Sequence, residues 1–169
     1  DMSAHAQSGA TLPRALFDKM LAAKNFQSGM QMLRQIEFSL YDMRLHAEYV
    51  DAQPNMIFSV MNEVRDRVAV MPVPEFNRFA HSFSHIFAGG YSAGYFSYKW
   101  AEVLSADVFA MFEEAVAQGA PLLNQDLGQR YWREVLAVGG SRPAMTSFKA
   151  LRGREPQVDA LLRHSGLAA

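Results

Sequence analysis

The residues that could do chemistry gather in one short segment, HIFAGGYSAGYFSYKW at 85–100. It holds one histidine, two adjacent glycines and three tyrosines, in a chain without cysteine. Imidazole and phenol groups donate hydrogen bonds, so this set can bind polar groups and stabilise a developing negative charge. No obvious nucleophile accompanies them. The segment therefore predicts a site that binds and stabilises but does not start a reaction by itself.

The tyrosines and a nearby carboxylate have the spacing of one helix face. Tyr91, Tyr95, Tyr98 and Glu102 follow i, i+4, i+7 and i+11 spacing, which in a helix places them on one side. The residues on the other side would face a core: Phe96, Trp100, Val103 and Leu104. The alternative is that the tyrosines are packing residues with their hydroxyls in water, which is common for this residue type.

Gly89 and Gly90 come directly before this predicted helix. Glycine allows unusual dihedrals and the close approach of another chain's backbone, so the pair suits a loop that touches a ligand. His85 lies on the other side of that loop. We interpret the histidine, the glycines and the tyrosines as one candidate binding site.

Metal binding, serine hydrolysis and phosphate binding have less support in the sequence. His81 and His85 are four residues apart, as metal-binding histidine pairs on a helix are, but HSFSH lacks the glutamate that H-E-x-x-H needs as general base. No G-x-S-x-G elbow is present, and GREP and GGSRP do not match phosphate-binding glycine motifs. We therefore predict no metal ligand in this chain. His46 and His164 are better explained by packing and by a helix dipole.

Composition limits the classes of partner that the chain could bind. The chain has 169 residues, with 17 acidic against 16 basic side chains, so no overall field favours nucleic acid or anionic lipid. No apolar run reaches the roughly 18 residues that would span a bilayer, and DMSAHAQSGA lacks the pattern of a signal peptide. We predict neither a nucleic-acid partner nor a membrane partner. The absence of cysteine excludes disulfides.

The elements that must position the candidate site are all predicted to be helices. The first begins near Thr11 and Pro13, and the second and longest runs from about Asn25 to Val50. A third follows the break at Ala52-Gln53-Pro54, and prolines make a loop of 70–81. A long helix then runs from Ser92 to about Gly119, followed by two helices separated at 139–141 and a last one opening at Glu155. We predict one all-α segment covering 1–169.

Apolar periodicity predicts which helix faces are buried. The predicted core stripe of the second helix is Phe26, Met30, Leu33, Ile36, Leu40 and Met43. The predicted core stripe of the third is Ile57, Val60, Met61, Val64 and Val68. The polar side of the third helix is predicted to face solvent: Glu63, Arg65, Asp66 and Arg67.

Three stretches of the chain resemble one known family. FSHIFAGGYSAGYFSYKWAEVLSADVF is strongly similar to the substrate-side segment of thimet-oligopeptidase-like zinc metallopeptidases. LFDKMLAAKNFQSGMQMLRQIEFSLYDMRLHAEY and GGSRPAMTSFKALRGREPQVDALLRHSGL resemble the closing region of the same family. The resemblance covers essentially the whole chain. It implies the multi-helix C-terminal portion of a zincin-type peptidase catalytic domain.

The resemblance also implies a reaction and its cofactor. In this family an H-E-x-x-H helix and a later glutamate hold Zn²⁺, and a zinc-bound water attacks the peptide carbonyl while protein donors hold the oxyanion. This chain contains neither zinc motif, so both are expected upstream of Asp1. The resemblance therefore implies zinc in the full-length enzyme but not in this chain, which alone should be inactive.

Roles for single residues follow from the family's motif positions. Tyr98 corresponds to oxyanion stabilisation, while Tyr91 and His85 correspond to contacts with the substrate backbone. Gly89 and Gly90 would let their loop move against the peptide, Tyr95 is a weaker candidate for substrate binding, and Glu102 is read as a structural acceptor. The implied partners are short peptides and the missing N-terminal part of the same enzyme, in the cytoplasm. The alternative is a non-catalytic helical module that binds peptides or another protein.

Overall fold

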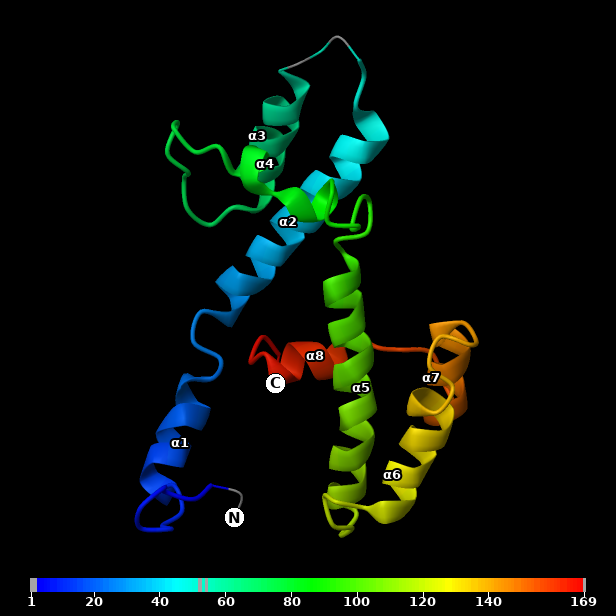
Figure 1. Cartoon of the computed structure of the whole chain (residues 1–169). Coiled ribbons are helices and arrows are strands. Elements are labelled where there is room, and N and C mark those ends of the chain that lie inside the picture. The colour runs from blue at the N-terminus through cyan, green and yellow to red at the C-terminus, as the bar shows by residue number, and fades with distance from the viewer. Residues whose placement is uncertain (1–2, 52, 54, 169) are drawn as a thin grey trace.

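The structure, a computed structural model, describes residues 3–51, 53 and 55–168. Within these ranges the chain consists of helices and loops, with no strand (Figure 1). This confirms the predicted all-α class. Ala52 and Pro54, which belong to the predicted break after the second helix, lie outside the described residues.

The helices follow the predicted order. They are α1 (Arg14–Ala23), α2 (Ser28–Glu48), α3 (Met56–Val68), α4 (Phe79–Ser82), the 3₁₀ turn η1 (Ser84–Ile86), α5 (Ser97–Ala117), α6 (Gln125–Tyr131), the π-helical turn η2 (Trp132–Leu136), α7 (Ala144–Arg152) and α8 (Asp159–His164). Two starts are later than predicted, because α5 begins at 97 instead of 92 and α8 at 159 instead of 155. The predicted loop of 70–81 ends in the short α4. At 21 residues each, α2 and α5 have equal length.

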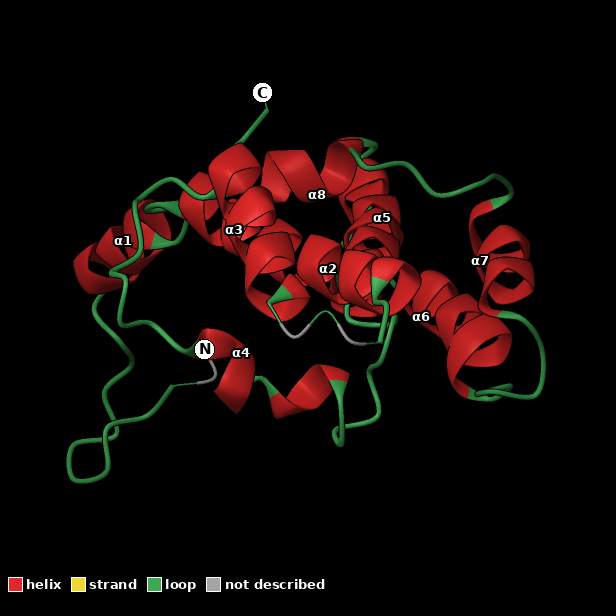
Figure 2. Cartoon of the chain, turned by 90° about the horizontal axis from the view of Figure 1, so that it is seen from above, coloured by secondary structure: helices red, strands yellow, loops and turns green. Residues whose placement is uncertain are grey.

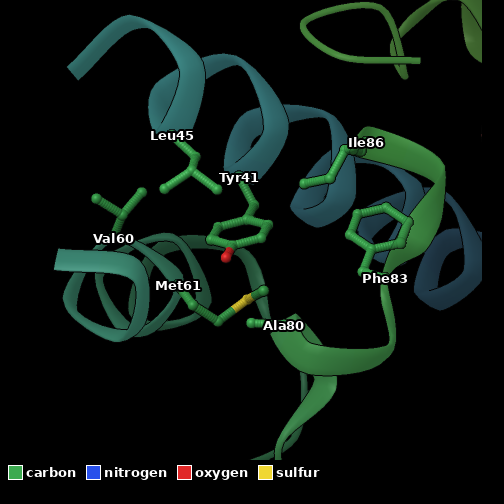
Figure 3. Packing of buried hydrophobic residues seen from close by; sticks show 7 residues of the cluster. All are labelled: Tyr41, Leu45, Val60, Met61, Ala80, Phe83 and Ile86. Carbon is green, nitrogen blue, oxygen red and sulfur yellow. The ribbon is translucent and has the colours of Figure 1, made fainter. Parts of the chain in front are cut away.

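One hydrophobic cluster joins α2, α3, α4 and η1. Its buried members are Tyr41, Leu45, Val60, Met61, Ala80, Phe83 and Ile86 (Figure 3). Aromatic rings extend it toward the start of α5: the rings of Phe38 and Phe79 stack with centroids 4.7 Å apart, and Tyr95 lies 5.1 Å from Phe83. Because Tyr95 packs on this cluster, the cluster fixes one end of the tyrosine segment.

A second, smaller cluster joins α5 to α8. Ala106 and Ala110 of α5 pack against Ala160 and Leu161 of α8, with Met32 of α2 beside them. Alanines at the contact leave room for the two helices to approach closely. Figure 2 shows α8 lying across α5, with α6 and α7 on the other side of α5. The first helix, α1, has no buried residue.

The predicted core stripe of α2 is wrong. Phe26 is 71% exposed and Met43 is 43% exposed, whereas the buried residues of α2 are Glu37, Tyr41, Asp42 and Leu45. Two carboxylates can lie on the buried face because each finds partners there: Glu37 binds arginines and Asp42 binds backbone N–H groups. Apolar periodicity counts such residues as surface and therefore places the face incorrectly.

The predicted faces of α3 and α5 are correct only in part. Val60, Met61 and Val64 are buried as predicted, but Arg65 is not on a solvated face, because it donates to Glu37 at 3.0 Å and to Asn77 at 3.1 Å. Phe96, directly before α5, and Trp100 of α5 are 48% and 44% exposed. The buried side of α5 is instead made by Ala106, Asp107, Ala110 and Met111.

Candidate functional site

The glycine pair shapes a tight return of the chain over η1. The N–H of Gly89 donates to the Ser84 carbonyl at 2.8 Å, and the N–H of Tyr91 donates to the His85 carbonyl at 2.9 Å. A Cβ on Gly89 would lie 2.6 Å from the His85 Cα, and Gly90 has a left-handed φ of +82°. Both glycines are thus required by the turn itself. The close approach predicted from them is to the chain's own backbone.

A buried aspartate of α2 anchors the next part of the loop. The N–H groups of Ala93 and Tyr95 donate to the two carboxylate oxygens of Asp42, each at 2.9 Å. Ala93 adopts a left-handed φ of 51°, and two bonds to one carboxylate stabilise that conformation. Asp42 is fully buried. The sequence analysis missed this residue, although a carboxylate one position after Tyr41 and three before Leu45 was a signal that the buried face needs an acceptor.

The tyrosines meet, but not along one helix. Tyr91 and Tyr95 lie in turns before α5, and only Tyr98 belongs to the helix, so the single-face prediction is wrong. The turns nevertheless bring the rings together: Tyr98 lies with its centroid 5.0 Å from Tyr91 and 5.1 Å from Tyr95. The ring of His85 lies 6.3 Å from Tyr91 and 6.2 Å from Tyr95. The loop thus gathers the four predicted side chains into one cluster.

The hydroxyl groups of the cluster are not equivalent. That of Tyr95 donates to Gln35 Oε1 at 3.2 Å, and burial raises the pKa of Tyr95 above its usual value. Tyr98 is 40% exposed, and hydrogen bonding with Tyr91 raises the pKa of Tyr98. A phenol is protonated at neutral pH, and the exposure of Tyr98 leaves its hydroxyl accessible as a donor. Glu102, predicted to be a structural acceptor, accepts from Lys99 at 2.5 Å.

A groove of about 770 Å³ lies beside Tyr95 and Tyr98. The first half of α2 lines it together with the end of α3 and the loop 69–74, and Lys99 and Glu102 of α5 also belong to its lining. Arg34 and Glu37 of α2 belong to its lining. The sequence analysis did not identify Arg34, because a charged residue on a helix with exposed neighbours carries no distinctive spacing.

The histidines do not form a metal site. His81 lies on α4 and His85 on η1, so the pair does not share one helix face. His81 instead packs edge-on against Phe58, with centroids 5.4 Å apart. Among the described residues no three histidine, aspartate or glutamate side chains are grouped to hold a metal ion. Thus the described part of this chain does not supply the set of ligands that a zinc ion requires.

His46 and His164 have structural surroundings, as predicted. His46 Nδ1 lies 2.9 Å from Asp42 Oδ1, within α2. His164 lies at the end of α8, where its Nε2 is 2.9 Å from Glu113 Oε2. In the described ranges, no helix combines the length and apolar composition needed to cross a bilayer.

The profile of Peptidase family M3 matches residues 1–167. The chain belongs to this family. It is 51% identical to oligopeptidase A of Escherichia coli over 166 residues. This match covers 98% of the chain and 24% of that protein. Probable cytosolic oligopeptidase A of Arabidopsis thaliana is 46% identical over 98% of the chain and 23% of its own length. Saccharolysin of Saccharomyces cerevisiae is 33% identical over 99% of the chain and 23% of its own length.

These similarities confirm the resemblance found in the sequence. The helical chain corresponds to part of an M3 metallopeptidase and spans about a quarter of the length of the curated relatives that it matches. The relatives are named as peptidases. Peptide hydrolysis is therefore the reaction to consider for the tyrosine cluster and the groove.

Proposed function

We propose that this chain is the C-terminal part of the catalytic domain of a zinc oligopeptidase that hydrolyses short peptides. In this proposal it supplies substrate-binding and oxyanion-stabilising residues. One observation carries the proposal beyond family membership: a half-exposed Tyr98 lies beside Tyr91 and at the edge of the groove. The name of the Arabidopsis relative refers to the cytosol, and a cytoplasmic location is part of the proposal.

Tyr98 is the proposed oxyanion donor. When water attacks a peptide carbonyl, the oxygen gains negative charge, and a phenol aimed at that oxygen stabilises the transition state more than the substrate. A phenol has an ordinary pKa of about 10, so the proton needed for this bond is present at neutral pH. In the proposed step the Tyr98 hydroxyl donates to the oxyanion.

Tyr91 and His85 are the proposed contacts with the substrate backbone. Their rings lie 6.3 Å apart, and both are held by the turn in which Tyr91 N–H donates to the His85 carbonyl. Two donors carried by one turn can align an extended peptide. Tyr95 has a weaker claim, because its hydroxyl donates to Gln35. Gly89 and Gly90 shape the loop that carries these contacts.

Zinc is part of the proposed enzyme but not of this chain. The described residues do not fit a zinc site, so the proposal assigns every zinc ligand to the remainder of the longer peptidase. That remainder is also the proposed partner of this chain. It follows that the chain alone should neither hold stoichiometric zinc nor cleave peptides.

The test is Tyr98→Phe in the full-length peptidase, which removes one hydroxyl and leaves the ring. We expect kcat to fall by roughly 10²–10³-fold while KM changes much less, as when one oxyanion donor is lost. Tyr95→Phe is the matched control and should cost less, because its hydroxyl is bonded to Gln35. Zinc content and thermal stability should stay near wild type in both variants.

Two outcomes would contradict the proposal. If Tyr98→Phe keeps full kcat or raises KM alone, Tyr98 is a binding or packing residue. If the zinc-loaded full-length protein binds short peptides but hydrolyses none, the non-catalytic peptide-binding module is the correct function.

A further inference from the structure

His46 of α2 makes contacts around the site loop, residues 87–96, that the proposed reaction does not use. Its Nδ1 lies 2.9 Å from Asp42 Oδ1 and 2.9 Å from the main-chain carbonyl oxygen of Asp42. Both oxygens are acceptors, since Oδ1 also accepts the N–H of Ala93. The ring nitrogen between them must therefore carry a proton, whichever charge the imidazole has. The geometry makes His46 a donor to Asp42.

Asp42 has three donors and no exposure to solvent. Oδ1 accepts from His46 and from the N–H of Ala93, and Oδ2 accepts from the N–H of Tyr95. A carboxylate that turned about its Cβ–Cγ bond would lose its alignment with both loop amides. The donor on its own helix restricts that rotation, because a buried network in which every member is satisfied is rigid.

The ring of His46 also contacts the site loop on the other side of the glycine pair. Its centroid lies 6.1 Å from that of Phe87, with the two planes tilted by 45°, which is within the range of interacting aromatic rings. Both rings line a small groove of about 340 Å³, together with Leu45, Tyr49 and Ile57. Phe87 precedes the glycine pair and Ala93 follows it. One imidazole therefore contacts both sides of the tight turn, directly at Phe87 and through Asp42 at Ala93.

We infer that His46 is a positioning residue of the candidate site and acts through Asp42 on the site loop. The inference rests on the proposed function, because that function assigns the loop its contacts with the peptide. His46 does not belong to the lining of the groove beside Tyr98, so it acts on the substrate only through the loop. Positioning of this kind matters for the rate, since a displacement of about 1 Å at a reacting group can lower it about 100-fold.

The test compares two substitutions at position 46 in the zinc-loaded full-length peptidase. In asparagine the amide nitrogen is bonded to Cγ, as Nδ1 is in histidine, so His46→Asn keeps a donor for Asp42. In glutamine the amide nitrogen is bonded to Cδ and lies further out, as Nε2 does in histidine, so His46→Gln loses that donor. Because neither variant keeps the ring, the difference between them isolates the hydrogen bond.

We expect His46→Gln to disturb the site loop and the binding of substrate. Hydrogen exchange of the segment 91–96, followed by mass spectrometry, should become about tenfold faster or more, which is the range for a lost charge-assisted hydrogen bond. KM should rise and kcat per folded enzyme should fall, whereas His46→Asn should stay closer to wild type in all three measurements. Exchange in α7 should not change, because α7 reports only general destabilisation.

His164→Gln is the matched control. His164 also lies near a helix end beside a carboxylate, but its contact with Glu113 Oε2, at 2.9 Å, uses Nε2. A glutamine amide reproduces that position and lies outside the site loop. The same substitution should therefore leave KM, kcat and the exchange of the segment 91–96 unchanged.

Two results would overturn the inference. One is equal behaviour of His46→Asn and His46→Gln, since the hydrogen bond to Asp42 would then contribute nothing. The other is an equal rise of exchange in α7 and in the site loop, since His46 would then only stabilise the fold. Hydrogen exchange needs no turnover and so separates this inference from the proposed function. If the peptidase hydrolyses no peptide, the proposed function fails, and the exchange of the segment 91–96 decides whether His46 positions the loop.

Discussion

Asp42 is the residue on which the conformation of the candidate site depends most. It touches no proposed substrate, but its two oxygens accept the N–H groups of Ala93 and Tyr95. Through these bonds a fully buried carboxylate of α2 positions the loop that carries Tyr91 and leads into Tyr98. A positioning residue of this kind is not visible in a search for chemical motifs. Arg34 was missed for a related reason, since its orientation depends on Glu37 and on aromatic neighbours.

Asp42→Asn should loosen the loop. The amide keeps one accepting oxygen but presents its NH₂ group to a backbone N–H, which leaves one buried donor unpaired at a cost of about 1–3 kcal/mol. We expect faster hydrogen exchange at the amides of Ala93 and Tyr95 and a lower kcat/KM in the full-length enzyme. Asp18→Asn on the exposed α1 is the control. Unchanged exchange at both amides would show that the loop holds its conformation without Asp42.

Gly89→Ala should displace the same loop from a different contact. Its Cβ would lie 2.6 Å from the His85 Cα, and backbone cannot move aside as a flexible side chain can. We expect a loss of thermal stability together with a lower kcat/KM. Gly128→Ala in α6 is the matched control, because nothing lies within 4 Å of its Cβ and alanine favours a helix interior by about 1 kcal/mol. Equal stability of the two variants would contradict the steric clash expected between a Cβ at position 89 and the His85 backbone.

The helices themselves are held together by buried charge as well as by apolar packing. Asp107 of α5 is 1% exposed and accepts from Arg154 at 2.6 and 2.7 Å, from Arg152 at 3.1 Å and from the N–H of Gln157 at 2.8 Å. These bonds hold the connection between α7 and α8 in a non-helical conformation. They explain why α8 begins at Asp159, whereas the sequence predicts a start at Glu155.

Asp107 should make the α5–α8 contact sensitive to acid. Burial alone would raise the pKa of Asp107, but the hydrogen bonds from Arg154 and Gln157 outweigh it and hold the pKa below its usual value. Its contribution to the free energy of unfolding is therefore complete above the ordinary carboxyl pKa of about 4 and is lost as pH falls through the lower folded value. We expect thermal stability to drop below about pH 4 in a titration followed by circular dichroism.

Asp107→Asn separates this effect from general acid unfolding. The variant should lose about 3 kcal/mol at neutral pH, because two arginines lose a buried partner, and its remaining stability should depend less on pH. Glu155→Gln is the control: that carboxylate is 75% exposed and pairs with Lys149, so it should behave as wild type. A pH dependence that is identical in Asp107→Asn and wild type would overturn the assignment.

Helix order could be predicted from sequence across the whole molecule, but the buried faces could not. Prolines and glycines are local signals, so the α-helices other than α4 appear in the expected order, whereas α4 ends the segment predicted to be a loop. Which side of α2 is buried depends on Arg65 and on the loop N–H groups, which are distant in sequence. The candidate site shows the same contrast between local signals and contacts that are distant in sequence. Its residues were predicted together, but turns before α5 bring them together, not one helix face.

Much apolar surface of the molecule is left uncovered. Leu16 and Met20 of α1 are 50% and 62% exposed, and Phe26 is 71% exposed. A further groove of about 530 Å³ between α5 and the α6–α7 pair is lined largely by apolar side chains, among them Phe109 and Phe112. Apolar surfaces of this kind mark interfaces or drive association. Since the chain spans about a quarter of its relatives' length, the proposed partner for these surfaces is the remainder of the peptidase.

The 169-residue chain, prepared alone, should therefore associate with itself. Its exposed apolar side chains gain free energy when they leave water, at about 25 cal/mol per Å², and no net charge of consequence opposes contact, since the formal charge is −1. We expect sedimentation to show concentration-dependent oligomers and a hydrophobic dye to bind. Met20→Lys with Phe26→Lys should reduce both signals, whereas Lys19→Gln, on the same helix but without apolar area, should reduce neither. Co-expression with the remainder of the peptidase should suppress dye binding, because the partner covers the same surface. A strictly monomeric chain at high concentration that binds no dye would show that these side chains need no partner.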